Sequence, residues 1–348
     1  MKRLFLVCVT VMLSSVFLFA NGQGEKKSSG KANKQYLIRL GHSNPPDDKN
    51  IIQYTSKYFK QKVEEYSNGR IKVEIYPSNQ LGSDQDQIRA LQNGSQQMTY
   101  TSVQNFATFA PPLYCFSLPY LFTSGDAATK AVFALWDKDT DWLVTKGGVR
   151  PVAWAVAGFR NLTTDKNHPV RTLDDVKGLK VRIPSNAISE AAFKKLGFEP
   201  VPLAYSEVFT ALQQGVVSGQ ENCYTAAVAE HYDEVQKYVI DIQWQYTIGL
   251  FAISEEYYKT LPDDLKQVII KAGKEATQAE IDKFAESDKN DIATLKSKGM
   301  KFLGQPADYD KWIELGRSIW PKQYSLIGEG DAAKGKAIVD DVLTIISK

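Results

Sequence analysis

The amino-acid sequence predicts an α/β fold built in two successive parts, on the basis of three features. Apolar strands and amphipathic helices alternate between residues 36 and 94, and a second such run begins near residue 151. Residues 263–298 have a helix-forming composition without proline, which is unusually long for one helix of a globular protein. A helix of that length can run along both parts and couple them. The 348 residues of the chain are enough for two modest domains.

The first run begins at residues 36–43, an alternating strand that ends in a glycine, a histidine and a serine. Apolar side chains then recur at helical spacing up to Tyr66, and residues 71–75 alternate apolar with charged side chains. Ser83 starts a capping box with an acidic residue three positions later, which predicts a helix over residues 84–93. The order strand, helix, strand, helix predicts a parallel sheet with helices on its faces.

The second run repeats this pattern. Residues 152–157 are apolar and predict a buried strand, and residues 179–183 alternate before Pro184 ends them. Residues 186–196 carry apolar side chains on one helical face and are followed by a glycine, which predicts a helix and its end. A shorter helix is expected over residues 208–215.

The amino-terminal segment has the pattern of an export signal. Two basic residues precede an apolar run over residues 4–19, which predicts a signal peptide over residues 1–20 and a flexible tether over residues 21–35. A membrane anchor and a lipid-modified cysteine are the alternatives. The run is short for a spanning helix, and Cys8 lies inside it, too early for a comfortable anchor site. We therefore expect a soluble mature chain outside the cytoplasm.

Charge excludes a nucleic-acid partner of the usual kind. The chain has 42 basic and 40 acidic residues, and Lys2 and Arg3 fall in the expected signal, so the mature chain is balanced. A balanced chain has no long-range attraction for polynucleotides. Cys115 and Cys223 remain after cleavage, and the sequence leaves open whether they form a disulfide or two separate buried thiols.

Metal, nucleotide and nucleophile motifs are weak or incomplete. The three histidines are widely separated and belong to no metal-ligand pattern; they are His42, His168 and His231. Cys223 and His231 could be drawn as a nucleophilic pair, but no oxyanion-hole signature accompanies them. Residues 330–336 match the spacing of a phosphate-binding loop, yet Ala337 lacks the hydroxyl that holds magnesium. We expect no catalytic residue, no metal and no cofactor.

Arg182 is the strongest candidate for binding a ligand. It lies on the polar face of the strand over residues 179–183, near the carboxyl end, where α/β sheets place their ligands. A guanidinium matches a carboxylate with two parallel hydrogen bonds. The spacing alone also fits a solvated surface arginine, and the same holds for Arg160. Asn222 could bind a ligand hydroxyl or cap a turn.

Several linked motifs resemble one family. The chain carries, in order, G-F-R-N-L-T at 158–163, D-D-V-K-G-L-K-V-R-I-P at 174–184, E-V-F-T-A-L-Q-Q-G at 207–215 and G-Q-E-N at 219–222. Tyr76-Pro77, residues 80–82 and S-L-P-Y-L-F at 117–122 also fit. Together they resemble the solute-binding subunits of tripartite ATP-independent periplasmic (TRAP) transporters, the DctP-like family.

The resemblance implies the two-lobed periplasmic-binding-protein architecture, with a long helix spanning both lobes and closure around a small organic acid. Lobe I would comprise residues 36–157 plus about 248–285, and lobe II residues 158–247 plus about 286–348. It further implies a periplasmic protein, without enzymatic activity, that delivers its ligand to a small and a large membrane subunit. We also expect a monomer, although the sequence does not fix the oligomeric state. The alternative functions are a sensor that presents the same ligand to a membrane receptor, and an exported enzyme.

The resemblance also implies roles for individual residues. Arg182 falls on the family's carboxylate-clamping arginine. Other expected ligand contacts are Arg160, Asn222, Tyr205, Ser102, Asp84 and Ser43. Ser102 stands where binders of sialic acid tend to have an acidic residue, and Ser218 stands where the family usually has aspartate. The serine at position 102 disfavours sialic acid. The sequence leaves open whether the ligand is a sugar acid, a dicarboxylate or a keto acid.

Overall fold

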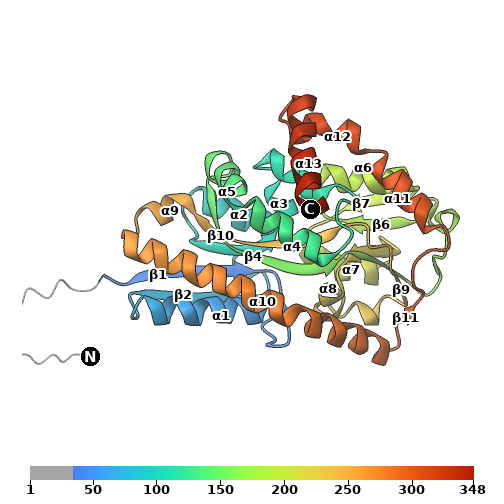
Figure 1. Cartoon of the computed structure of the whole chain (residues 1–348). Helices are drawn as coiled ribbons and strands as arrows, with labels where there is room; N and C mark the ends of the chain where they lie inside the picture. Colours follow the sequence, from blue (N-terminus) through green and yellow to red (C-terminus); the bar gives the residue numbers. More distant parts are fainter. Residues whose placement is uncertain (1–33) are drawn as a thin grey trace, which may run out of the picture. The chain divides into compact units, whose positions relative to one another are not determined.

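The computed structural model describes residues 34–348, which form an α/β protein with two mixed sheets (Figure 1). The expected signal peptide, Cys8 and nearly all of the expected tether lie outside the described residues. Within residues 34–348, no helix combines the length and apolar character needed to cross a membrane. The predicted fold class, with two lobes and a long helix, is confirmed.

The first sheet has five strands in the order β2-β1-β3-β10-β4. Their bounds are Ile71–Tyr76, Tyr36–His42, Met98–Ser102, Tyr246–Ser254 and Val149–Phe159. β1 pairs in parallel with β2 and β3, and β10 runs antiparallel between β3 and β4. Figure 1 shows α1 and α10 on one face of this sheet and α2, α4 and α5 on the other; their bounds are Ile51–Tyr66, Asp263–Ser297, Asp84–Gln92, Gly125–Ala134 and Trp136–Thr145.

The second sheet has six strands in the order β11-β9-β5-β8-β6-β7. Their bounds are Lys301–Phe302, Tyr238–Ile240, Asn161–Thr164, Gly219–Asn222, Lys180–Ile183 and Glu199–Pro202. β6 pairs in parallel with β7 and β8, so these three strands end at the same edge. The helices that follow them are α6 (Ala187–Leu196), α7 (Val208–Gln213) and α8 (Tyr224–Ala229).

Shorter helices and the carboxyl-terminal segment complete the fold. They are α3 (Val103–Phe106), η1 (Pro111–Ser117), η2 (Leu173–Val176), η3 (Tyr205–Glu207), η4 (Tyr232–Glu234), α9 (Glu255–Lys259), α11 (Tyr309–Arg317), α12 (Trp320–Ile327) and α13 (Ala332–Ser347). α12 and α13 pack on each other and on η1, and α13 also packs on α4. Residues 330–336, which resemble a phosphate loop, form the end of a turn and the first turns of α13, with Asp331 as its N-cap.

Local signals in the sequence set the helix ends. The Ser83 hydroxyl oxygen accepts a hydrogen bond from the Asp86 amide, and the Asp86 carboxylate accepts one from the Ser83 amide. These two hydrogen bonds form the predicted capping box of α2. Asn186 caps α6 by accepting from two backbone amides. Gly197 ends α6 with φ of 104°, a left-handed conformation that glycine adopts without steric cost.

Two neighbouring segments of the chain connect the sheets. β4 of the first sheet continues through Arg160 into β5 of the second, and residues 241–245 lead back from β9 to β10. The Arg160 amide donates to the Gln245 carbonyl oxygen at 2.8 Å, so the two connections are hydrogen-bonded to each other. A third connection runs from β10 through α9 and α10 to β11, so any change in the angle between the sheets must be absorbed by this pair of segments and by that long connection.

The long helix α10 spans 35 residues and packs on elements that belong to both sheets or follow their strands. Its first half packs on α1 and on β4, and its second half packs on α8. Gly273 allows this approach, because a Cβ there would lie 1.6 Å from the Val152 carbonyl oxygen. Thr277 Oγ1 accepts from the Trp154 amide and Glu280 Oε1 from the Val156 amide, both at 3.0 Å. The helix therefore satisfies amides on the outer edge of β4, where no further strand pairs.

Glu280 makes the stability of the fold depend on pH. Burial, partly offset by hydrogen bonds from Thr55 and the Val156 amide, raises its pKa from 4.5 to about 8. Between these two values the folded chain holds a proton that the unfolded chain has released, so its stabilising contribution is complete below 4.5 and is lost as pH rises through about 8. Glu280→Gln should remove that loss. At about pH 9 we expect the free energy of unfolding of the variant, measured with urea, to be higher than that of the wild type by more than about 1 kcal/mol. The reason is that a pKa difference of one unit between the folded and unfolded states is worth about 1.4 kcal/mol.

The matched control is Glu286→Gln, an exposed glutamate on the same helix. It should leave the pH dependence of unfolding unchanged. A Glu280→Gln variant whose stability relative to the wild type is the same at about pH 4 and about pH 9 would contradict the assignment.

Candidate functional site

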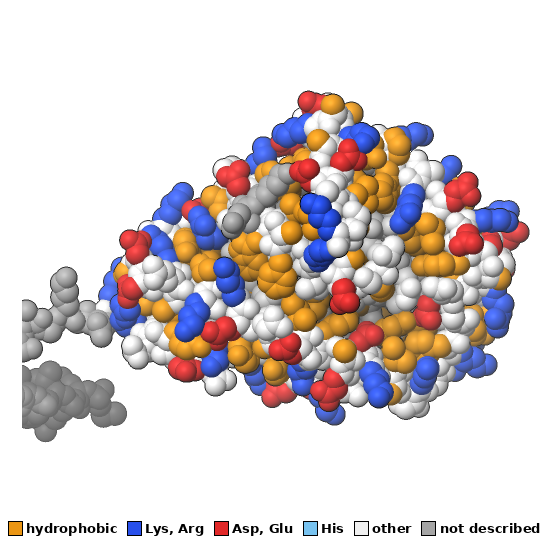
Figure 2. All heavy atoms as spheres, viewed as in Figure 1, with side chains coloured by type: hydrophobic (Ala, Val, Ile, Leu, Met, Phe, Trp, Pro, Cys, Tyr) orange, Lys and Arg blue, Asp and Glu red, His pale blue; other side chains and the backbone are white. Residues whose placement is uncertain are grey.

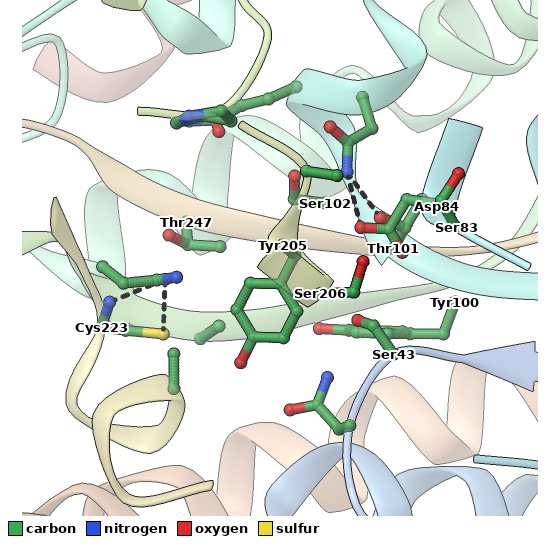
Figure 3. A pocket seen from close by; sticks show the side chains of 18 of the residues that line it. Ser43, Ser83, Asp84, Tyr100, Thr101, Ser102, Tyr205, Ser206, Cys223 and Thr247 are labelled. Atoms are coloured by element: carbon green, nitrogen blue, oxygen red, sulfur yellow. Dashed lines mark hydrogen bonds between the residues drawn. The ribbon is translucent and has the colours of Figure 1, made fainter. Parts of the chain in front are cut away.

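A cavity of about 150 Å³ lies between the two sheets, and all seven residues expected to contact a ligand line it. They are Ser43, Asp84, Ser102, Arg160, Arg182, Tyr205 and Asn222. A cavity of this volume can hold a molecule at least the size of benzene. Figure 3 shows the Tyr205 ring near its centre, with Cys223 and Thr247 to one side and Ser102, Thr101 and Asp84 to the other.

Three parallel strands of the first sheet deliver one wall of the cavity. Ser43 directly follows β1, Asp84 begins the helix after β2, and Ser102 is the last residue of β3. Because β1, β2 and β3 are parallel, their carboxyl ends meet at one edge. This is the edge where open α/β sheets bind their ligands.

Three parallel strands of the second sheet deliver the facing wall. Arg182 lies in β6, Tyr205 follows β7, and Asn222 ends β8. The Asn222 Oδ1 atom accepts from Arg160 Nη1 at 3.1 Å and from the Cys223 amide at 3.0 Å. Its side-chain nitrogen is thereby left as the group of Asn222 that can donate to a ligand.

Arg182 is a buried cation without an acidic partner. Its side chain is 3% exposed. Its Nε and Nη2 atoms donate to the Leu203 carbonyl oxygen at 3.1 and 2.7 Å, which fixes the plane of the guanidinium. None of the carboxylates whose side chains the structure describes forms an ion pair with it, and burial lowers its pKa. The sequence left open whether this arginine is solvated, and in the structure it is buried.

Arg160 is also buried, but its charge is compensated. Nε and Nη2 donate to the two carboxylate oxygens of Glu221 at 2.5 and 2.9 Å. Trp244 Nε1 donates to the same carboxylate at 2.6 Å. Burial disfavours the charged guanidinium, but the Glu221 carboxylate outweighs this and holds the pKa of Arg160 above its ordinary value. Arg160 thus joins the connection between the sheets to β8.

Asp84 is the acidic group of the cavity wall. Asn105 Nδ2 donates to its Oδ2 atom at 3.2 Å and also to Thr101 Oγ1 at 2.8 Å. The Oδ1 atom is buried and has no hydrogen-bond partner among the described residues. Burial raises the pKa of Asp84 to about 6, and Thr101, the charge of Arg182, Asn105 and Ser43 offset part of the rise.

Cys223 and His231, the nucleophilic pair that the sequence allowed, line different hollows. Cys115 and Cys223 are both buried, and no disulfide joins them. Burial raises the pKa of the Cys223 thiol to about 11, which keeps it neutral and poorly nucleophilic at ordinary pH. His231 lies in a different hollow, between α10 and the loop after β1. Among the described residues, no group of histidine, cysteine and carboxylate side chains is placed to hold a metal ion.

Several cavity residues were not predicted from the sequence. They are hydroxyl and amide side chains from both walls, including Asn44, Asn79, Ser83, Thr101, Gln104, Asn105, Ser185, Ser206 and Thr247. Small polar residues of this kind are equally common in turns and caps, so their type gives no signal. The position of Asn44, just after the predicted strand at residues 36–43, could have indicated that residue.

Comparisons with known proteins agree with this architecture. The family model of the bacterial extracellular solute-binding proteins, family 7, matches residues 40–326. A C4-dicarboxylate-binding periplasmic protein of Rhodobacter capsulatus is 31% identical over 282 residues, 80% of this chain and 84% of that protein.

Solved structures give the same result. A TRAP periplasmic solute-binding protein of Rhodobacter sphaeroides, crystallised open and without ligand, is 36% identical with a TM-score of 0.74 and covers 90% of this chain and 99% of its own. A sugar-acid-binding protein of Advenella mimigardefordensis, in complex with galactonate, is 27% identical with a TM-score of 0.83 and the same coverage. The family consists of binding proteins rather than enzymes. The chain therefore belongs to family 7 of the bacterial extracellular solute-binding proteins, the DctP family associated with TRAP transporters.

Proposed function

We propose that this protein captures a small organic acid, a sugar acid or a dicarboxylate, and delivers it to a TRAP-type secondary transporter. The observation that carries the proposal is the buried guanidinium of Arg182, which has no acidic partner among the described residues. A buried charge without a counter-ion is costly. A ligand carboxylate would supply the counter-ion and would accept two hydrogen bonds from the fork of the guanidinium.

The arrangement of the cavity supports a closing motion. Arg182, Tyr205 and Asn222 would hold the acid on the second sheet, and Ser43, Asp84 and Ser102 would complete the site from the first. Arg160 would contact the ligand as well, while its Nε and Nη2 atoms remain hydrogen-bonded to the Glu221 carboxylate. Bending at the two hydrogen-bonded connections between the sheets, with α10 following as the third, would open and close the cavity. The bound acid would favour the closed form.

The lobes would be divided as the sequence predicts, at about residues 157 and 248, with α10 passing from one to the other. The packing of α12 and α13 on η1 and α4 favours assigning these two helices to the first lobe instead of the second.

Binding without turnover fits the cavity, whose cysteine is a neutral thiol. We further propose that the protein acts in the periplasm as a monomer and meets a small and a large membrane subunit. Basic and acidic side chains are interspersed over the face seen in Figure 2, so this face offers no basic patch of the kind that attracts polynucleotides.

A thermal-melt screen of mature protein, from about Tyr36, against organic acids and their neutral amides tests the proposal. An acid at about 100 times its dissociation constant adds roughly 2.7 kcal/mol, which corresponds to a rise of a few degrees. We expect shifts with carboxylates and none with the amides. If protein freed of carried-over ligand shows no shift with any acid, the proposed function is wrong.

A further inference from the structure

We propose that the captured acid carries one carboxylate at one end and hydroxyl groups at the other, as a sugar acid does, and that Asp84 selects it over a dicarboxylate. This inference rests on the proposed function, because it concerns the same cavity. It goes further in assigning the two ends of the ligand to two different walls.

The charges of the cavity provide for one anionic group. Three charged side chains line it: Asp84, Arg160 and Arg182. Arg160 is neutralised by the Glu221 carboxylate through two hydrogen bonds. Arg182 is therefore the one cation of the lining that can serve as counter-ion to a ligand. A second ligand carboxylate would find no unpaired cation along the described lining.

Asp84 makes the opposite wall unfavourable for a second carboxylate. Asn105 donates to its Oδ2 atom, and the Thr101 and Ser43 hydroxyls lie near the carboxylate and help to lower its pKa. No described residue places a donor in hydrogen-bonding geometry with its buried Oδ1 atom. A buried acceptor without a donor costs about 1–3 kcal/mol, and a ligand hydroxyl can supply the missing hydrogen bond. A carboxylate has no proton to donate and adds like-charge repulsion, which is costly in a buried site.

The rest of that wall suits hydroxyl groups. Ser43, Ser83, Thr101 and Ser102 offer groups that both donate and accept, and no lysine is present among the lining residues. Asn44, Asn79, Gln104 and Asn105 add neutral amides. Neutral groups of mixed donor and acceptor character match the edge of a polyhydroxy chain better than a charged end group.

Galactonate and galactarate form the sharpest probe pair, because they differ only in the terminal carbon, a hydroxymethyl group in the first and a carboxylate in the second. Titration calorimetry on the wild type, with gluconate and glucarate as a second pair and succinate alongside, gives the ratio of dissociation constants within each pair. In the pair that contains the better-bound one-carboxylate acid, we expect that acid to bind at least about tenfold more tightly than its two-carboxylate partner. A tenfold difference in dissociation constant is about 1.4 kcal/mol.

Asp84→Asn tests the residue itself. Asparagine keeps the shape of the side chain, removes its negative charge and adds a hydrogen-bond donor. The ratio of dissociation constants within each pair should therefore shift in favour of the two-carboxylate acid by at least about tenfold. Asp86→Asn is the matched control, because Asp86 lies on the same helical turn but is exposed and outside the cavity. It should leave the ratio unchanged even where the loss of the capping box lowers stability. Unliganded melts of both variants check that they fold.

The outcomes separate this inference from the proposed function. Tighter binding of galactarate, glucarate or succinate than of the one-carboxylate acids would overturn the inference and leave the proposed function standing. An unchanged ratio in Asp84→Asn would overturn the role of Asp84. Absence of binding for every acid would overturn both.

Discussion

We expect Arg182→Met to weaken binding of the captured acid by about 30-fold to several thousand-fold. The ligand carboxylate would lose its buried counter-ion, and truncating one side of such a pair typically costs about 2–5 kcal/mol. The unliganded variant should be at least as stable as the wild type. No described carboxylate pairs with Arg182, so methionine removes the cost of an uncompensated buried charge. Calorimetry and melts without ligand measure the two effects separately.

Arg150→Met is the matched control for this change. Arg150 forms two hydrogen bonds with Glu255, at 2.7 and 2.9 Å, outside the cavity. Its loss should lower stability and leave the dissociation constant unchanged, the reverse of the pattern for Arg182. An Arg182→Met protein that binds the acid within a few-fold of the wild type would show that Arg182 does not hold the carboxylate.

Glu221→Gln should destabilise the unliganded protein by about 3–5 kcal/mol, the usual cost of breaking a buried ion pair from one side. Glu221 is fully buried and accepts from Arg160 and from Trp244 Nε1. Glutamine keeps the shape but leaves Arg160 as a second buried cation without a counter-ion. Urea unfolding measures the loss.

Glu190→Gln provides the control, because its pair with Lys194 is an exposed one on a helix surface. Such pairs contribute only about 0.3–0.5 kcal/mol. A Glu221→Gln variant within about 1 kcal/mol of the wild type would mean that the ion pair with Arg160 contributes little to the connection between the sheets.

Periodicity in the sequence was enough to predict the elements that alternate clearly. The strands at residues 36–42 and 71–76 and the helices capped by Ser83 and Asn186 are found where expected. The long helix also ends within a residue of the prediction. In each case the local sequence signal, either alternation or a helix cap, favours the same secondary structure as the packing in the folded chain.

Elements without a local signature were not predicted. β10 lies inside the first sheet and all nine of its residues are buried, so its sequence shows no alternation between faces. The short strands β5, β7 and β8 have four residues each, and none of them shows the alternation that predicted the equally short β6. Their existence depends on neighbours that are distant in the sequence.

Placement of the candidate site residues followed from the resemblance to a family, but the environment of each did not. Arg160 and Arg182 both lie at strand ends and look alike in the sequence. Only the fold brings Glu221 to Arg160 and leaves Arg182 with a backbone carbonyl oxygen. The sequence equally gives no sign that one oxygen of Asp84 lacks a donor.

The position of the bound carboxylate can be seen in a crystal structure of the protein with the best-bound acid of the thermal screen. We expect a ligand carboxylate oxygen within about 3 Å of a free nitrogen of Arg182, in the cavity between the sheets. A ligand whose carboxylate lies away from Arg182, or which binds outside this cavity, would contradict this expectation.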